Sequence, residues 1–212
     1  EQIGAVVLTG AGRAFCAGAV LDDLLEAGSS DADGALPDIY RGFLRVAHTT
    51  LPTVAAVNGA AVGAGMNMVL ACDLVIAGRS AKFDSRFLTI GIHPGGGHTW
   101  RLRNITELHT TKAMVLFGQV LEGEEAARRG IAWECVDDDV LINEAVTYAA
   151  KAAGHPRDLM AVTKRTLHDA AAVTESAAAV RLEIEPQVWS MQQPAFTEMV
   201  AKLKAEIATK HS

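Results

Sequence analysis

Short apolar runs recur through the first half of the chain, at residues 3–8, 53–57 and 74–77. Each run is rich in β-branched residues and is bounded by glycine or polar residues. Continuous apolar runs of this length are typical of strands that are buried in a sheet. We therefore predict three buried strands in this part of the chain.

Between these runs the apolar positions change to a helical spacing. Residues 38–49 carry apolar side chains at the i, i+3, i+4 and i+7 positions of one helix face, namely Tyr40, Phe43, Leu44 and Ala47. A polar segment, 27–36, precedes this helix, and a second helix is predicted over about 64–72. Strands and helices thus alternate, which is typical of an α/β layer fold.

Beyond about residue 106 the pattern becomes mainly helical. We predict helices at 107–117 and 122–129, a strand at 131–136, and four Ala-rich helices at 139–153, 157–171, 173–188 and 194–210. The sequence is divided into an α/β core, residues 1–137, and a helical C-terminal region, residues 138–212. Such helices usually pack against a neighbour, and we expect this region to take part in oligomerisation.

Composition excludes several classes of function. The chain has 212 residues and a formal net charge of −6, which does not suit a nucleic-acid-binding protein. It has no apolar run of about 18 residues, so no membrane span is expected, and it opens on a strand-like run rather than a signal peptide. The three cysteines follow no metal-ligand spacing, so we expect no metal and a cytoplasmic location.

Two stretches of small residues carry the chemistry. Gly-Arg-Ala-Phe-Cys-Ala-Gly-Ala spans residues 12–19, and Val-Asn-Gly-Ala-Ala-Val-Gly-Ala-Gly spans residues 57–65. We interpret each as a turn that follows a strand, the place where α/β sheets bind ligands. Small residues let the backbone approach a ligand closely, so two N–H groups can converge on one oxygen and form an oxyanion hole.

The order and spacing of several segments resemble the crotonase (enoyl-CoA hydratase/isomerase) family. They read GRAFCAG, LPTVAAVNGAAVGAG, ACDLVIAGRSAKF, GIHPGGGHTWRL and MVLFGQVLEGEEAARRGIAWECV. The resemblance implies a spiral of ββα units with a helical C-terminal region, assembled as a homotrimer or a dimer of trimers. The family's N-terminal β-hairpin has no counterpart in this sequence, for which we expect a truncated or partly ordered N-terminus rather than a different fold.

The resemblance also implies an acyl-coenzyme A thioester as ligand, with coenzyme A as part of the substrate and no further cofactor. The oxyanion-hole donors would be the backbone N–H groups of Ala19 and Ala64. Alanine replaces the family's middle glycine at residue 64, which a backbone donor tolerates. The contacts to the coenzyme A nucleotide are left unassigned.

The match breaks at the two catalytic glutamates of the family's hydratases. Asn67 and Phe87 stand at these positions. Neither an amide nor a phenyl ring can act as a general base, so hydration by the two-glutamate route is not expected. We predict an acyl-CoA lyase or isomerase with a non-standard active site.

Histidine is the natural replacement for a missing base, because its pKa is about 6.5. His93 is our candidate acid/base, and Tyr40, Asn67, Phe87 and Trp100 are predicted to line the acyl pocket. Asp84 and Arg86 are interpreted as a local ion pair, and His98 as a cap of the following helix. Asp73 is assigned a structural role.

Three hypotheses remain. The first is an enzyme that stabilises an enolate in the oxyanion hole, as isomerisation and decarboxylation require. The second is a non-catalytic acyl-CoA-binding protein. The third is a purely structural or assembly role.

Overall fold

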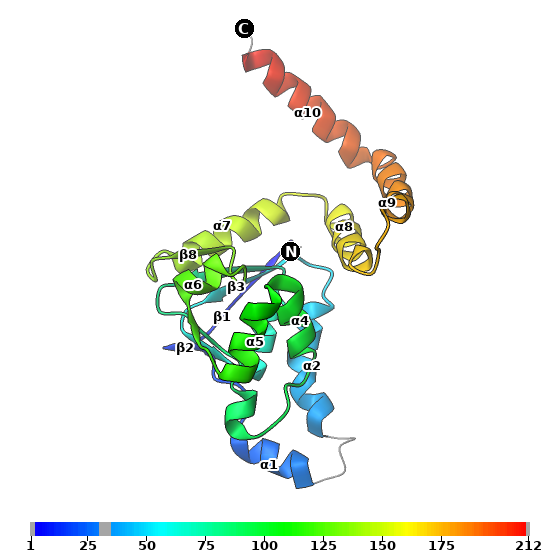
Figure 1. Ribbon diagram of the computed structural model, residues 1–212. Helices are drawn as coiled ribbons and strands as arrows, with labels where there is room; N and C mark the ends of the chain where they lie inside the picture. The colour runs from blue at the N-terminus through cyan, green and yellow to red at the C-terminus, as the bar shows by residue number, and fades with distance from the viewer. Residues whose placement is uncertain (1–2, 30–34, 211–212) are drawn as a thin grey trace. The chain divides into compact units, whose positions relative to one another are not determined.

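The computed structural model describes residues 3–29 and 35–210 (Figure 1). The chain divides into two compact units, Glu1–Ala152 and Ala153–Ser212. Of the predicted polar segment 27–36, residues 30–34 lie outside the described residues.

The first unit contains a four-stranded sheet, here called the first sheet, whose strands are all parallel. Its order is β1-β3-β5-β8. The observed strands are β1 (Val6–Thr9), β3 (Thr53–Val57), β5 (Leu74–Gly78) and β8 (Glu134–Val136). The pairing is regular: Leu8 lies opposite Ala55, and Ala55 lies opposite Val75. The predicted strands are confirmed, with differences of up to three residues at their ends.

A second sheet, which the sequence did not predict, has the order β2-β4-β6-β7. Its strands are Ala14–Cys16, Ala60–Val62, Lys82–Asp84 and Leu121–Glu122. The two small-residue stretches that we interpreted as turns therefore each contain a short strand. Strands of two or three residues are too short to show a periodic pattern, which explains the error.

The strands arise in pairs, because each successive unit of the chain sends one strand to each sheet and then continues into helix. The first pair, β1 and β2, leads to α1 and α2; the second, β3 and β4, to α3; the third, β5 and β6, to the 3₁₀ helix η1 and then α4 and α5. This is the predicted spiral of ββα units. The helices of these units are α1 (Leu21–Ser29), α2 (Ala35–Ala47), α3 (Ala64–Leu70), η1 (Phe87–Ile90), α4 (His98–Ile105) and α5 (Leu108–Phe117). Helix α6 (Gly123–Arg128) lies between β7 and β8.

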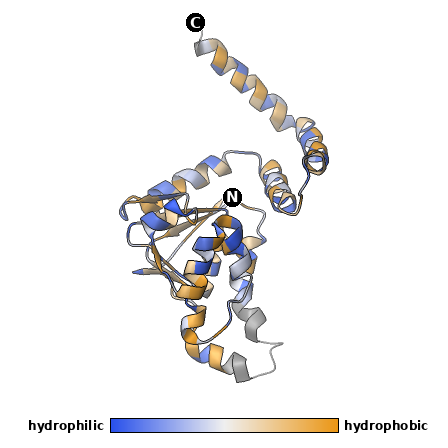
Figure 2. Cartoon of the chain, in the orientation of Figure 1, coloured by the Kyte–Doolittle hydropathy of each residue, from blue (hydrophilic) through white to orange (hydrophobic). Residues whose placement is uncertain are grey.

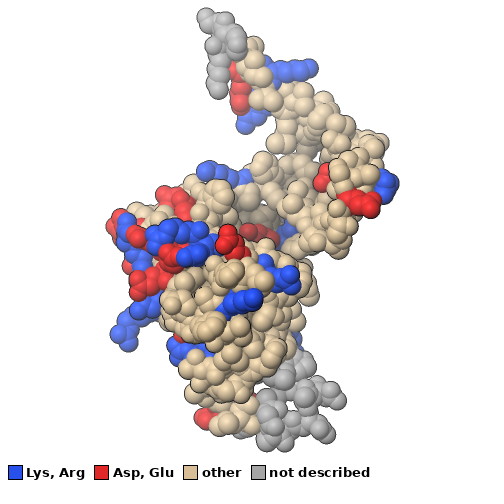
Figure 3. All heavy atoms as spheres, in the orientation of Figure 1, with Lys and Arg blue, Asp and Glu red and all other residues tan. Residues whose placement is uncertain are grey.

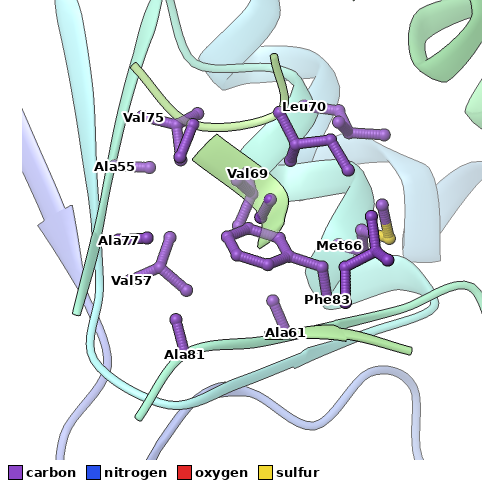
Figure 4. Packing of buried hydrophobic residues seen from close by; sticks show 14 of the residues in the cluster. Ala55, Val57, Ala61, Met66, Val69, Leu70, Val75, Ala77, Ala81 and Phe83 are labelled. Atoms are coloured by element: carbon purple, nitrogen blue, oxygen red, sulfur yellow. The ribbon is translucent and has the colours of Figure 1, made fainter. Parts of the chain in front are cut away.

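Alternate residues of the first sheet face two different hydrophobic clusters. One face packs with α3 and the second sheet; Figure 4 shows Ala55, Val57, Val75 and Ala77 near Met66, Val69 and Phe83. The other face packs against α7 (Leu141–Ala153), where Val54, Ala56 and Ile76 contact Leu141, Ala145 and Ala149. Every residue of β3 is therefore buried.

Helix α7 belongs with the core for the same reason. Its buried residues form part of the cluster under the first sheet, and the first compact unit extends to Ala152. The core is thus longer than the boundary at residue 137 that we drew from the sequence.

A polar contact lies at one end of the β3–β5 pairing. Asp73 Oδ2 accepts hydrogen bonds from the backbone N–H and the hydroxyl of Thr53, each 2.8 Å long. The backbone N–H of Asp73 in turn donates to the Thr53 carbonyl oxygen. The structural role predicted for Asp73 is confirmed.

The second unit contains helices α8 (Arg157–Ala170), α9 (Ser176–Met191) and α10 (Pro194–Lys210). Helix α8 contacts α9, and α9 contacts α10. Apolar residues recur along all of α10 (Figure 2), and Val180, Ile184, Met199 and Leu203 are exposed. Exposed apolar surface of this kind is compatible with oligomerisation, which stays a prediction.

Charged side chains of both signs are intermixed on part of the surface (Figure 3). Arg79 forms ion pairs with Glu124 and Asp137, and Glu125 pairs with Arg128 and Arg129. Exposed pairs of this kind add little stability. No helix among residues 3–29 and 35–210 is long and apolar enough to cross a membrane.

The first turn of α3 lies directly against β2. A Cβ atom built on Gly65 would come within 2.2 Å of the backbone oxygen of Cys16, a distance that no side chain tolerates. The residue at this position must therefore be glycine for α3 to pack in this place.

We expect Gly65→Ala to lower the free energy of unfolding by about 2 kcal/mol or more, because overpacking would push α3 away from β2. Chemical denaturation followed by circular dichroism measures this. Gly42→Ala in α2 is the matched control, since a Cβ there meets nothing within 4 Å. The control should be stabilising by about 0.4–1 kcal/mol. Equal effects of the two substitutions would contradict the close-approach argument.

Candidate active site

A cavity of about 450 Å³ lies in the first unit beside the start of α3. Its walls come from the segments after β2 and β4, from α1, α2 and α3, and from the segment that follows β6. The lining residues are Ala17, Gly18, Ala19, Leu21, Leu24, Tyr40, Val62, Gly63, Ala64, Asn67, Arg86, Phe87, Ile90, Ile92, His93 and Gly95. Most of these side chains are apolar, so the cavity suits a ligand with an apolar part.

The two predicted oxyanion donors, Ala19 and Ala64, both line this cavity. Gly18 brings their backbones together: it has a φ of 98°, and a Cβ built on it would lie 2.8 Å from the Val62 oxygen and 3.9 Å from the Ala64 nitrogen. Within the described part of the chain, neither the Ala19 nor the Ala64 N–H has a hydrogen-bond acceptor. Two free donors therefore lie close together at the cavity wall.

Asn67 belongs to a buried chain of hydrogen bonds. Its Nδ2 donates to the Gly95 carbonyl oxygen over 3.1 Å, and its Oδ1 lies 2.8 Å from His98 Nδ1. His98 Nε2 lies 2.8 Å from the Ser85 hydroxyl. A carbonyl oxygen can only accept, so the Gly95 oxygen fixes the orientation of the amide. His98 must then donate from Nδ1 and accept the Ser85 proton at Nε2.

This arrangement requires a neutral His98 ring, and its surroundings enforce that state. His98 is 1% exposed. Burial lowers the pKa of His98 from 6.5 to about 4, and the positive charge of Arg101 contributes. Burial also lowers the pKa of Arg101, whose guanidinium donates to the Gly96 oxygen. The interpretation of His98 as a helix cap is wrong: Gly97 occupies the N-cap position of α4.

Asp84 and Arg86 form the predicted ion pair. Arg86 Nε donates to Asp84 Oδ2 over 2.8 Å, and a second guanidinium nitrogen contacts the same oxygen. This bond raises the pKa of Arg86. Arg86 has a φ of 56°, the only positive φ of a non-glycine residue in the described segments. The pair thus holds the chain in a strained turn directly before Phe87.

Phe87, His93 and Tyr40 lie on the cavity wall. The Phe87 ring packs against His98 with centroids 4.9 Å apart. His93 Nδ1 lies 2.8 Å from the Pro94 oxygen, which can only accept, so in the neutral ring Nε2 carries the lone pair. The Tyr40 hydroxyl lies against Gly95, where a Cβ would be 2.3 Å away.

Trp100 is placed differently from our expectation. It lies on α4, is 63% exposed, and does not line the cavity. The larger apolar lining residues Leu21, Leu24, Ile90 and Ile92 were not predicted from the sequence. An apolar residue on either side of Gly91 was a visible signal for the last two, because a tight turn exposes both side chains to the same space.

Carboxylates are absent from the described wall. No Asp or Glu is among the lining residues given above, whereas Asn67 and Phe87 both are. Within residues 3–29 and 35–210, no three His, Cys, Asp or Glu side chains gather in a metal-binding arrangement. The polar groups of the wall are amide, imidazole, phenol and guanidinium.

The pH dependence of stability tests the neutral state of His98. Its folded pKa, about 4, is below the unfolded value of 6.5. The unfolded state therefore takes up the proton first as the pH falls, and stability present above pH 6.5 is lost toward pH 4, by about 3 kcal/mol in total. We expect His98→Asn, which keeps a donor toward Asn67 but cannot titrate, to remove this part of the pH dependence. Parallel pH profiles of unfolding for the two proteins would show that His98 does not titrate as described.

Comparisons with known proteins agree with this geometry. Residues 1–203 match the sequence pattern of the enoyl-CoA hydratase/isomerase family. The probable enoyl-CoA hydratase EchA14 of Mycobacterium tuberculosis is 43% identical over 205 residues, covering 94% of this chain and 79% of that protein. The 1,2-epoxyphenylacetyl-CoA isomerase of Escherichia coli is 35% identical over 178 residues, covering 80% of this chain and 66% of the isomerase.

Solved structures give the same result. The crystal structure of a putative enoyl-CoA hydratase/isomerase from Mycobacterium abscessus has a TM-score of 0.86 at 28% identity, covering 96% of this chain and 79% of that one. The structure of Pseudomonas aeruginosa PA4980 has a TM-score of 0.76 at 34% identity, covering 85% and 77%. With the fold, the cavity and the sequence in agreement, the chain belongs to the enoyl-CoA hydratase/isomerase family.

Proposed function

We propose that this protein binds an acyl-CoA thioester and stabilises its enolate between the backbone N–H groups of Ala19 and Ala64. One observation carries the proposal: two N–H groups without an acceptor in the described chain lie close together at the wall of a mostly apolar cavity. Both residues are only partly buried and line the cavity, so a ligand oxygen bound there could accept from both N–H groups.

The thioester carbonyl oxygen is the group that such a site would hold. When a proton leaves the carbon next to the thioester, negative charge moves onto this oxygen. Fixed donors then bind the enolate more strongly than the neutral thioester, and only such a difference accelerates the reaction. The apolar wall strengthens the effect, because it keeps water away from the charge.

His93 is the base in this proposal. Its Nδ1–H donates to the Pro94 oxygen, which leaves the Nε2 lone pair available, and the residue lines the cavity. Nε2 would take the proton from the α-carbon, while the electron pair of the broken C–H bond moves to the thioester oxygen. Return of the proton to a different carbon completes an isomerisation, and no other reactant is consumed.

The residues at positions 67 and 87 oppose hydration by a pair of carboxylates. An amide and a phenyl ring cannot remove a proton from water at neutral pH. Among the relatives, EchA14 is named as a probable hydratase and the E. coli protein as an isomerase. The absence of a carboxylate from the described cavity wall favours the isomerase type of reaction.

Crotonyl-CoA separates these reactions. We expect calorimetric titration to show binding, while the absorbance of the conjugated enoyl thioester decays only slowly on addition of enzyme. Rapid hydration would contradict the proposed chemistry and would require another base. Absence of any acyl-CoA binding would contradict the function as a whole.

Exchange of α-protons tests the oxyanion hole. Butyryl-CoA in deuterated water should gain deuterium next to the thioester, as measured by mass spectrometry. We expect Ala64→Pro to slow this exchange by about 10²–10³, because proline removes the N–H but is tolerated at the first position of a helix. Ala64→Gly is the matched control, since it keeps the N–H and should exchange within a few-fold of the unaltered protein.

His93→Gln tests the base in the same assay. We expect exchange to fall by about 10²–10⁴ with little change in the dissociation constant of butyryl-CoA, because only proton transfer is removed. Unchanged exchange would rule out His93 as the base. Binding without exchange in the unaltered protein would identify a non-catalytic acyl-CoA-binding protein instead.

A further inference from the structure

The amide of Asn67 has a single orientation in its buried position. Rotating it by half a turn would place Oδ1 against the Gly95 oxygen. This contact would be repulsive, since it pairs two acceptors, and the Gly95 carbonyl oxygen has no donor form. The bonds of 3.1 Å to Gly95 and 2.8 Å to His98 therefore keep Nδ2 on the side of Gly95.

One N–H of this amide remains available. Nδ2 carries two hydrogens, and Gly95 accepts one of them. No second acceptor for Nδ2 is found among the described residues, although Asn67 lines the cavity and is 1% exposed. His98 is itself held by the Ser85 hydroxyl, so the network beneath Asn67 is complete. Because Asn67 lines the cavity, we infer that the remaining donor is met by a group of the ligand.

The position of Asn67 on α3 indicates which part of the ligand it meets. It follows Ala64 by three residues, and side chains at this spacing lie on one face of a helix, about 5–6 Å apart. With the thioester oxygen at the N–H of Ala64, a separation of this size would place the amide near the second and third carbons of the acyl group.

We propose that Asn67 is a specificity-determining residue that donates a hydrogen bond to an oxygen on the second or third acyl carbon, and that His98 is the positioning residue that holds it. This rests on the function proposed above. The ligand class is then an acyl-CoA with an ether, epoxide, hydroxyl or oxo oxygen close to the thioester. A plain hydrocarbon chain is disfavoured, because it leaves the buried donor without an acceptor.

Two saturated thioesters of similar shape test this directly. 3-Methoxypropionyl-CoA carries an ether oxygen on its third carbon, and pentanoyl-CoA has a methylene group in its place. An ether oxygen can only accept, so a preference for it reports a donor in the cavity. We expect the protein to bind the ether about three- to tenfold more tightly by isothermal titration calorimetry, the difference made by one hydrogen bond.

Asn67→Leu has a similar volume and no donor, and it should abolish or reverse this preference. His98→Leu should also reduce the preference, because the amide loses the partner of its Oδ1. His98→Asn places an amide N–H near the former Nδ1 and should restore it, whereas a merely structural role of His98 would leave the ratio of the two dissociation constants unchanged. Circular dichroism and thermal unfolding show which variants are folded, and only folded variants are compared.

The outcomes separate the two proposals. Equal affinities for the two thioesters in the unaltered protein, or a preference that persists in Asn67→Leu, would overturn the assignment of Asn67 and leave the acyl-CoA site intact. Failure to bind either thioester would overturn the proposed function itself. A preference retained in folded His98→Leu would overturn the positioning role of His98 alone.

Discussion

The close contact between the first turn of α3 and strand β2 is the constraint on which the cavity depends. Gly65 lies against the backbone oxygen of Cys16, and Gly18 lies against that of Val62, in both places with no room for a side chain. This contact brings the segment after β2 beside the start of α3. The N–H groups of Ala19 and Ala64 consequently reach the same end of the cavity, although 45 positions separate them in the sequence. The short strands β2 and β4 hold both segments in place.

The polar side of the cavity is built on a different physical basis. Ser85, His98, Asn67 and Gly95 form a continuous series of hydrogen bonds in which every direction follows from one carbonyl oxygen that can only accept. Because the ring of His98 stays neutral, this series holds no charge at physiological pH. The described cavity wall therefore holds neutral polar groups and no carboxylate beside this series, and the proposed activity relies on the oxyanion hole and on His93.

Much of this could be predicted from the sequence, and the failures have physical causes. The strands of the first sheet and the C-terminal helices have enough residues to show their period, and they were found within a few positions. The strands of the second sheet have at most three residues and mostly small side chains, so they resembled turns.

For the site, Ala19, Ala64, Asn67, Phe87 and His93 all line the cavity, because motif spacing fixes where they lie on the fold. The sequence could not show that Trp100 faces solvent, because within one turn of α4 some side chains point toward the cavity and others away from it. The role of His98 depends on contacts with residues 13 and 31 positions away, which no local pattern encodes.

The first sheet carries apolar side chains on both faces, and this has a consequence for how its strands find their alignment. In a sheet with one solvent-exposed face, shifting a strand by one residue would move its apolar side chains into water and its polar side chains into the core. The cost of this exchange alone fixes the register. Here residues Val54 to Val57 of β3 are apolar on both faces, so solvation discriminates less against a slip. The paired bonds of Thr53 and Asp73, directly before the Val54–Leu74 pair, supply the missing discrimination. Two polar residues at the end of a hydrophobic sheet therefore favour the observed register of β3 with β5 over a register shifted by one residue.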